Sequence, residues 1–157
     1  MTRAIRGVTE DFVRVEIAEA KTPAQREAAL DIRFRVFVDE QGISKDLELD
    51  DEDSRCLHVI AIAGGKTVGT ARMYRAADSE KSVKIGRMAV LREYREAGVG
   101  RAILEFLISH ARAEGYRRAI LHAQVQALEF YAKCGFIAEG SVFDEAGIPH
   151  QKMVRDL

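Results

Sequence analysis

A short segment places two glycines and two arginines between a hydrophobic run and a long helical pattern. The segment 90-VLREYREAGVGRAILEFL-107 contains Arg95, Gly98, Gly100 and Arg101. Peptide N–H groups at the start of a helix lack intrahelical acceptors, and the helix dipole favours negative charge there. Glycines let the backbone approach a ligand, and arginines add charge-assisted hydrogen bonds. The spacing therefore predicts a loop that binds a phosphate or pyrophosphate.

Two common phosphate loops are excluded by the residues that follow the glycines. A Walker loop needs Lys-Ser or Lys-Thr after its last glycine, and here Arg101-Ala102 follows Gly100. The dinucleotide fingerprint G-x-G-x-x-G needs a third glycine, and position 103 is Ile. A plain turn between a strand and a helix stays open as the alternative.

The loop must be held by a strand before it and a helix after it. The segment 83–91 reads as a strand, and 98–114 reads as a helix with one apolar stripe. A second buried strand follows at 118–123. A strand, a crossover helix and a second strand form a right-handed unit, so these two strands are predicted to be parallel.

The remaining segments predict an otherwise antiparallel sheet. Thr22, Pro23 and Gln25 form a helix start with a capping box, and this helix should run through residue 41 and stop near Gly42. Strands and a short helix are expected at 12–18, 57–63, 66–75, 127–134 (the helix), 136–140 and 150–156. The predicted fold class is mixed α/β, with helices on both faces of the sheet, as a single domain over residues 1–157.

Composition excludes several classes of function. The net charge is −1, which argues against nucleic acid as the main partner. The sequence has no apolar run of membrane-spanning length and no signal-peptide pattern, so we expect no membrane partner. The two cysteines, Cys56 and Cys134, do not have metal-ligand spacing, so we expect no metal and a cytoplasmic location.

One acidic run stands out at residues 45–55. It has six acidic and two basic residues, a local charge of −4 in a chain of −1. A solvated loop is the favoured interpretation, because most charge runs are solvated. The alternative is a negative rim that attracts a cationic substrate such as an amine.

Two motifs in this order resemble the GNAT acetyltransferase superfamily. The family pattern [QR]-x-x-G-x-[GA] matches residues 95–100, and its aromatic pair before a Gly-Phe strand start matches 129-EFYAKCGF-136. The resemblance covers nearly the whole chain, and the segments 33–41, 85–90, 122–124 and 147–150 are similar to its ElaA-like branch. Glu96 departs from the glycine common at its position, which is acceptable only if its carboxylate faces solvent.

The resemblance implies acetyl-coenzyme A as co-substrate. The loop amides would hold its pyrophosphate, and the strand backbone would hold the pantetheine arm and the acetyl carbonyl, between two strands that part there. The residues expected at this cofactor site are Met88, Ala89, Val90, Arg95, Glu96, Ala97, Gly98, Val99, Gly100, Arg101 and Ala102. Gly86 inside the strand 83–91 independently predicts a bulge or a close backbone approach.

Acetyl transfer to an amine also needs an acid and a base. Tyr131 matches the tyrosine that many family members place beside the sulfur, and its hydroxyl can protonate a departing thiolate. The family's usual glutamate base has no counterpart, because Lys84 and Arg87 occupy that neighbourhood. His122 and His150 are the candidate bases, and a hydrogen-bonded structural role is the alternative for each.

Four residues at helical spacing predict an acceptor site. Arg33, Phe37, Glu40 and Gln41 follow i, i+4, i+7, i+8 spacing and would share one face of the first helix. In the resembled family this helix borders the acceptor, so these four, with Arg72 and His150, are the predicted substrate contacts. The alternative is a helix edge that packs one aromatic residue and exposes its polar neighbours.

The predicted function is transfer of the acetyl group of acetyl-CoA to a primary amine of a small molecule or peptide, with homodimer formation left open. A second interpretation rests on 33-RFRVFVDEQGI-43 followed by 48-ELDDED-53, which resembles acyl-homoserine-lactone synthases; these usually carry a tryptophan, and this chain has none. A third is a non-catalytic CoA-binding module, which would not need Tyr131.

Overall fold

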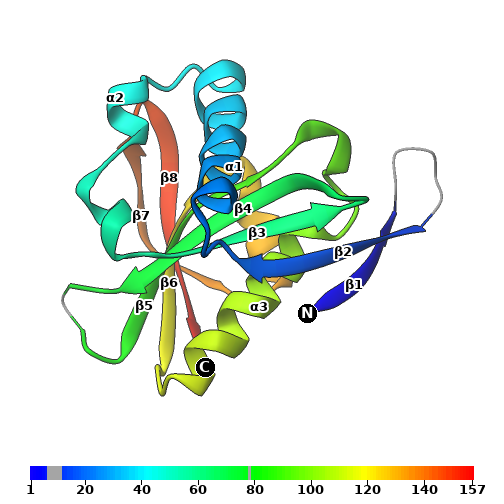
Figure 1. Cartoon of the computed structure of the whole chain (residues 1–157). Helices are drawn as coiled ribbons and strands as arrows, with labels where there is room; N and C mark the ends of the chain where they lie inside the picture. Colours follow the sequence, from blue (N-terminus) through cyan, green and yellow to red (C-terminus); the bar gives the residue numbers. More distant parts are fainter. Residues whose placement is uncertain (7–11, 78) are drawn as a thin grey trace. The chain divides into compact units, whose positions relative to one another are not determined.

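The computed structural model describes residues 1–6, 12–77 and 79–157 (Figure 1). The strands are β1 (Thr2–Arg6), β2 (Phe12–Glu19), β3 (Leu57–Ala63), β4 (Lys66–Arg75), β5 (Ser82–Val90), β6 (Arg118–Gln124), β7 (Ile137–Glu145) and β8 (Ile148–Asp156). The α-helices are α1 (Pro23–Arg33), α2 (Lys45–Glu48), α3 (Val99–Ala113) and α4 (Leu128–Lys133). A π-helical segment (Phe34–Glu40) and 3-10 turns (Asp51–Arg55, Arg92–Tyr94, Val125–Ala127) complete the order. None of the helices in these ranges has the length and apolar content of a membrane crossing.

The sheet is mostly antiparallel, as predicted. Its strand order is β1-β2-β3-β4-β5-β6-β8-β7. β5 and β6 run parallel from the pair Ser82–Arg118 to the pair Ile85–Leu121, and α3 is the crossover between them. The pairs β1–β2, β2–β3, β6–β8 and β7–β8 are antiparallel. The mixed α/β class and its parallel pair are therefore confirmed.

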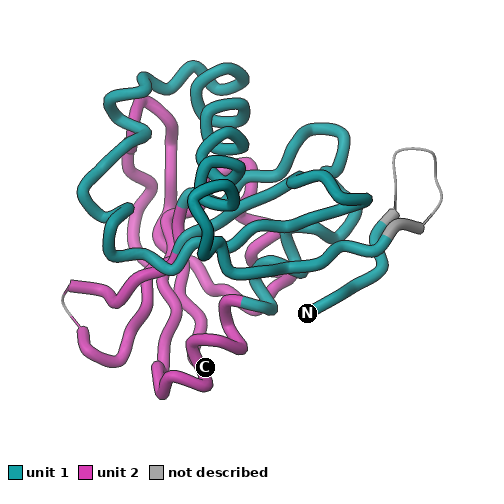
Figure 2. Tube along the Cα trace, in the orientation of Figure 1, with its two compact units in different colours: residues 1–72, 87–106 teal, residues 73–86, 107–157 magenta. Residues whose placement is uncertain are grey.

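The chain divides into two compact units (Figure 2). Unit 1 comprises residues 1–72 and 87–106, and unit 2 comprises residues 73–86 and 107–157. The glycine loop therefore belongs to unit 1, whereas His122 and Tyr131 belong to unit 2. A single domain over the whole chain stays a prediction.

Helix α1 begins where the sequence predicts. The Thr22 side chain accepts from the Gln25 N–H at 3.1 Å, and the Gln25 side chain accepts from the Thr22 N–H at 3.0 Å, which completes the capping box. The prediction of one continuous α-helix through residue 41 is wrong after Arg33, because the chain continues as a π-helix to Glu40. The Gln41 N–H bonds the Val36 carbonyl at 3.1 Å, five residues back.

The hairpin of β3 and β4 has the predicted bounds. Gly64 and Gly65 both have positive φ, 57° and 78°. This is the conformation of a type I′ turn, whose twist matches the flanking strands and which glycine adopts without a Cβ penalty. β1, α2 and the 3-10 turn Asp51–Arg55 were not predicted.

In unit 2, buried and less buried residues alternate along β6. Ala119, Leu121 and Ala123 are buried, and the alternate residue His122 is half-buried on the opposite face. β7 and β8 form one hairpin, longer than the predicted strands 136–140 and 150–156. Its turn passes through Ala146 and Gly147, which both have positive φ.

Candidate active site

The glycine loop passes through two backbone positions with positive φ before α3. Glu96 has a φ of 61° and Gly98 a φ of 97°. For a residue other than glycine, such as Glu96, this conformation costs about 1–3 kcal/mol and is concentrated at ligand sites. The α3 bond from the Ala102 N–H to the Gly98 carbonyl measures 3.1 Å. The amides at the start of α3 are therefore arranged as they are at helix-end anion sites.

The side chains of this loop differ in exposure. Glu96, which replaces the glycine common in the family, is exposed to solvent, as its negative charge requires. Val99 and Ala102 are buried and anchor the first turn of α3 in the core of unit 1. Ala97, Gly98, Gly100 and Arg101 are half-buried.

Arg95 is held by a carboxylate that the sequence assigned to a different site. Its Nη1 and Nη2 donate to Glu40 at 2.6 and 2.7 Å, and its Nε donates to the Val90 carbonyl at 3.0 Å. Arg92 lies 3.6 Å from the same carboxylate. The bond from Arg95 lowers the pKa of Glu40, and the same bond raises the pKa of Arg95. Glu40, predicted to contact the acceptor, thus orients the arginine of the loop.

Gly69 on β4 lets the strand and helix of this site approach each other. A Cβ at Gly69 would lie 3.2 Å from the Ala89 carbonyl oxygen, 3.1 Å from an Ile103 methyl and 3.3 Å from a Val99 methyl. Ala89 itself is buried, and Met88 and Val90 are half-buried. The strand irregularity predicted at Gly86 falls on Arg87, whose φ is 50°. The sequence predicted a bulge or a close backbone approach at Gly86, and the positive φ lies one residue later.

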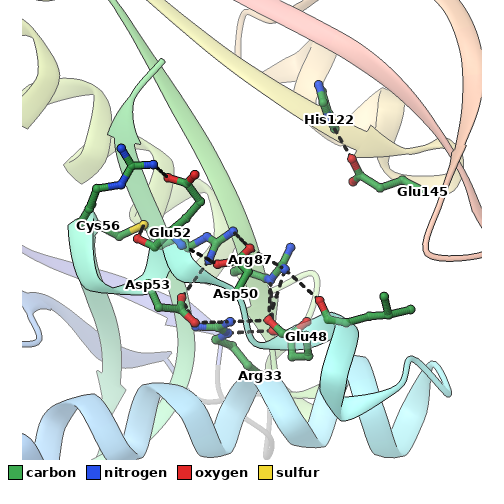
Figure 3. A network of polar contacts seen from close by, with 12 residues as sticks. Arg33, Glu48, Asp50, Glu52, Asp53, Cys56, Arg87, His122 and Glu145 are labelled. Atoms are coloured by element: carbon green, nitrogen blue, oxygen red, sulfur yellow. Dashed lines mark hydrogen bonds and ion pairs between the residues drawn. The ribbon is translucent and has the colours of Figure 1, made fainter. Parts of the chain in front are cut away.

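Three arginines and three carboxylates form a charge-balanced network in unit 1 (Figure 3). Arg33 donates to Glu48 at 2.7 Å and to Asp53 at 2.8 Å. Arg72 donates to Asp50 at 2.6 and 2.7 Å and to Asp53 at 2.8 Å. The third arginine, Arg87, lies 3.3 Å from Glu48 and 3.2 Å from Asp50.

This network changes the interpretation of the acidic run. Glu48 is 2% exposed, so the favoured interpretation of a solvated loop is wrong for this residue, whereas Asp46, Asp50 and Asp51 are exposed as that interpretation predicts. The hydrogen bonds from Arg72 lower the pKa of Asp50 to about 2. Burial has the opposite effect on Glu48 and raises its pKa, despite the bond from Arg33. The carboxylates of this segment thus bond arginines from other parts of unit 1, namely Arg33, Arg72 and Arg87.

The predicted acceptor residues of the first helix separate in the structure. Arg33 lies in the ion network, Phe37 is buried with Val36 and Ala89 in one apolar cluster, and Glu40 bonds Arg95. Gln41 is half-buried. The shared face required continuous α-helical spacing, which the π-helical segment does not keep. A role for these residues in acceptor binding stays a prediction.

Tyr131 occupies an aromatic cluster in unit 2. Its ring lies 5.0 Å from the ring of Phe130 and 6.1 Å from that of Phe136, both edge-on. Burial raises the pKa of Tyr131 above its ordinary value, and the adjacent Cys134 thiol adds to the increase. The hydroxyl is therefore a proton donor, not a phenolate, at neutral pH.

His122 and His150 face one carboxylate that the sequence did not single out. Glu145 Oε1 lies 3.0 Å from His122 Nδ1, and Glu145 Oε2 lies 3.6 Å from His150 Nε2. His150 Nδ1 lies 2.7 Å from the Ile148 carbonyl. The Phe143 ring meets His122 edge-on at 5.0 Å and stacks on His150 at 6.1 Å. The two imidazoles are thus parts of one cluster.

The signal that could have found Glu145 is the Ala-Gly turn that follows it. A two-residue turn at 146–147 makes a hairpin, and alternation then puts Phe143 and Glu145 on the same face as His150. Among the described residues, no group of three or more His, Cys, Asp or Glu side chains could hold a metal ion.

Sequence comparison finds relatives over nearly the full chain. A profile described as "Acetyltransferase (GNAT) domain" matches residues 18–157. The Bacillus subtilis protein named "Uncharacterized N-acetyltransferase YjcF" is 37% identical over 138 residues, 87% of this chain and 96% of that protein. Protein ElaA of Escherichia coli is 30% identical over 136 residues, 85% of this chain and 89% of ElaA.

Solved structures share the fold. An acyl-CoA N-acyltransferase from Pseudomonas aeruginosa superposes with a TM-score of 0.77 at 28% identity, covering 90% of this chain and 98% of that one. An aminoglycoside 6'-N-acetyltransferase complexed with coenzyme A gives 0.74 at 15% identity, covering 90% and 96%, a likeness of fold alone. The resemblance expected from the glycine loop is confirmed by the profile match and the relatives, and this chain belongs to the GNAT acetyltransferase family.

Proposed function

We propose that this protein transfers the acetyl group of acetyl-CoA to a primary amine of a small molecule or peptide. In this reaction the amine nitrogen bonds the acetyl carbon, the carbon–sulfur bond breaks, and the CoA thiolate takes up a proton. Membership of the family makes acyl transfer the reaction class. The acetyl donor and the amine acceptor are the finer parts of the proposal.

The backbone of the glycine loop is the main support for a CoA thioester as the acyl donor. Glu96 and Gly98 turn the backbone through positive φ directly before α3. This geometry supports a diphosphate site at the free amides of the helix start, because backbone strain such as that at Glu96 is concentrated at ligand sites. Arg95, aligned by Glu40, adds a directed cation at the same loop. The CoA complex of the distant aminoglycoside acetyltransferase agrees with this choice.

The protein's own residues would supply the acid and the base. Tyr131 is our proposed donor of the proton that the thiolate needs, because its raised pKa keeps the hydroxyl protonated. His122 is our proposed acceptor of the amine proton. His150, Phe37, Gln41 and Arg72 stay proposed acceptor contacts, and homodimer formation and a cytoplasmic location stay predictions.

The ion network of unit 1 weakens the interpretation as an acyl-homoserine-lactone synthase. Arg33 and the acidic segment 48–53 carried that resemblance, and their mutual bonds account for the pattern without a second substrate. An activity measurement distinguishes an acetyltransferase from a non-catalytic CoA-binding module, because the module would bind CoA without transferring an acetyl group.

The test combines binding with turnover. Purified protein is titrated with CoA, ATP and NAD in a thermal shift measurement, and then mixed with acetyl-CoA and a panel of amines, peptides and amino sugars while free thiol is recorded. CoA should raise the Tm by mass action, well beyond the effect of ATP or NAD. An equal shift with ATP would remove the cofactor assignment, and CoA binding without thiol release from any amine would favour the non-catalytic module.

A further inference from the structure

We propose that Glu145 is a positioning residue, which holds His122 in the tautomer of a general base; the inference rests on the proposed acetyl transfer. The β7–β8 hairpin brings Glu145 beside His122. All groups in the argument belong to unit 2.

The first step is the direction of the hydrogen bond between Glu145 and His122. The bond from His122 lowers the pKa of Glu145, so the carboxylate is ionised at neutral pH and only accepts hydrogen bonds. His122 Nδ1, 3.0 Å from Oε1, must therefore carry the proton. A neutral imidazole protonated at Nδ1 has its lone pair at Nε2, the atom that can accept a proton from an amine.

The second step distinguishes the two histidines. His150 Nδ1 lies 2.7 Å from the Ile148 carbonyl, which only accepts, so this ring also carries its proton at Nδ1. The His150 side chain is 9% exposed, and the His122 side chain is 25% exposed. His150 is thus enclosed beside Phe143 and the second oxygen of Glu145, and His122 is the accessible imidazole.

The third step is the place of His122 on its strand. The parallel ladder of β5 and β6 ends at the pair Ile85–Leu121, whereas β8 pairs with β6 on its other side from Arg118 to Gln124. His122 is the first residue of β6 after that ladder. The family resemblance implies that these two strands part toward their C-terminal ends to admit the thioester. An accessible base just beyond the ladder would then be placed to act on an incoming amine.

Other charged side chains lie around the cluster of His122, Glu145 and His150. Lys84 on β5 lowers the pKa of Glu145 through space, as do His122 and His150. Lys152 on β8 is the register partner of His122 and shares its face of the sheet. The only carboxylate that bonds His122 among the described contacts is Glu145. Removing it would take away the hydrogen-bond acceptor that fixes the proton at His122 Nδ1.

The proposed step balances in protons. The amine nitrogen forms its bond to the acetyl carbon while His122 Nε2 takes the amine proton, and the imidazolium is stabilised by the Glu145 carboxylate at Nδ1. The carbon–sulfur bond breaks, and the thiolate takes its proton from the proposed acid, Tyr131. His122 returns its proton to solvent, and Tyr131 regains one.

The experiment compares wild type with Glu145→Gln and His122→Gln, and uses Asp144→Asn as the matched control. Asp144 is the exposed neighbour on β7, so its change removes one carboxylate charge on the opposite face of the strand. Two kinds of measurement are made: kcat and KM with the acceptor found in the amine panel, and the 15N ring shifts of His122 at neutral pH.

We expect His122→Gln to lower kcat by about 10²–10⁴-fold, the usual contribution of a general base. Glu145→Gln should lower kcat by about 10–10⁴-fold with little change in the KM for acetyl-CoA. Asp144→Asn should keep the wild-type kcat, because the carboxylate that bonds His122 is Glu145. In wild type the ring shifts should report the Nδ1-protonated tautomer, and in Glu145→Gln a mixture.

Several results would overturn the inference. An Nε2-protonated His122 in wild type overturns it without any variant, so a poorly folded Glu145→Gln does not prevent the test. With an active wild type, an unchanged kcat in Glu145→Gln, or an equal loss of kcat in Asp144→Asn, overturns the inference alone. A wild type that transfers no acetyl group to any amine overturns the proposed function as well.

Discussion

Glu40 and Arg95 form a bidentate ion pair with contacts of 2.6 and 2.7 Å, between the π-helical segment and the glycine loop of unit 1. Bidentate pairs fix the orientation of a guanidinium as well as its place. Arg95 has five N–H groups, and three of them are used by Glu40 and the Val90 carbonyl. Two donors are thus left for a phosphate while the side chain stays aligned.

Changing Arg95 to Ala should weaken CoA binding about 10-fold or more, because a charge-assisted hydrogen bond contributes about 1.5–3 kcal/mol. Arg92→Ala is the matched control: its side chain is 75% exposed and its carboxylate contact is 3.6 Å. The Kd for CoA, measured by calorimetry, should change little in this control. Equal losses in both variants would indicate a diffuse charge effect.

Changing Glu40 to Gln should weaken CoA binding by less than Arg95→Ala does. Glutamine keeps one hydrogen bond to the guanidinium but not the second, so Arg95 becomes less well oriented. The same calorimetric titration gives the result. Tighter binding in Glu40→Gln would mean that Glu40 competes with the phosphate for Arg95 instead of aligning it.

Changing Gly98 to Val should weaken CoA binding far more than Gly65→Val does. Both glycines have positive φ, so both changes strain the backbone and lower the Tm. The nearest atom to a Cβ at Gly98 is an Ile5 methyl at 3.8 Å, so the core does not forbid the side chain. The side chain would instead obstruct the approach of a pyrophosphate. Normal CoA affinity in Gly98→Val would mean that Gly98 serves only to let the backbone turn.

Changing Tyr131 to Phe should lower kcat by about 10²–10⁴-fold and leave the Kd for CoA nearly unchanged. The phenyl ring keeps the edge-on contacts with Phe130 and Phe136. Because burial raises the pKa of Tyr131, the acid form persists at mildly alkaline pH, and Tyr131 should not produce a basic limb there. Wild-type kcat in this variant across the pH range would remove the hydroxyl from the mechanism.

Changing Asp50 to Asn should reduce the acid sensitivity of folding. The pKa of Asp50 is lowered to about 2 in the folded protein from an ordinary value of 3.8. A lowered folded-state pKa contributes stability that is complete above the unfolded value and is lost as pH falls toward 2. The urea midpoint of wild type should therefore fall in this window more steeply than that of Asp50→Asn. The control is Asp51→Asn, an exposed neighbour, which should follow wild type.

The raised pKa of Glu48 acts in the opposite direction. Its buried carboxylate is ionised at a cost, so this group alone would make the protein more stable as pH falls through its folded pKa. Asp50→Asn isolates the contribution that is lost on acidification. Identical pH profiles for wild type and Asp50→Asn would contradict the stabilising role of the Arg72–Asp50 pair.

The sequence by itself determined the features that depend on local chemistry. Thr22 and Gln25 specify a helix start within four residues, and Gly64-Gly65 specifies a tight turn, so both were predicted with correct bounds. The glycine loop is local in the same sense, because Glu96, Gly98 and the start of α3 are consecutive. Its residues therefore led directly to the family.

Only the tertiary structure decided which distant charges meet. Arg33, Asp53 and Arg72 are far apart in sequence, and nothing in their spacing indicates that they bond each other. Their burial explains why: a charge leaves water only with a partner, and the fold chooses that partner. The burial of Glu48 was not predicted, because its partners Arg33 and Arg87 lie outside the acidic run.

The same reason governs the acid–base residues. His122 and His150 were found by residue type, and the carboxylate between them was missed, because the register of β6, β8 and β7 places Glu145 beside His122. Register depends on which strands pair and where a hairpin turns, and a shift of one residue would put Glu145 on the other face. The sequence determined the groups available for chemistry, and the pairing of strands decided which of them share a proton.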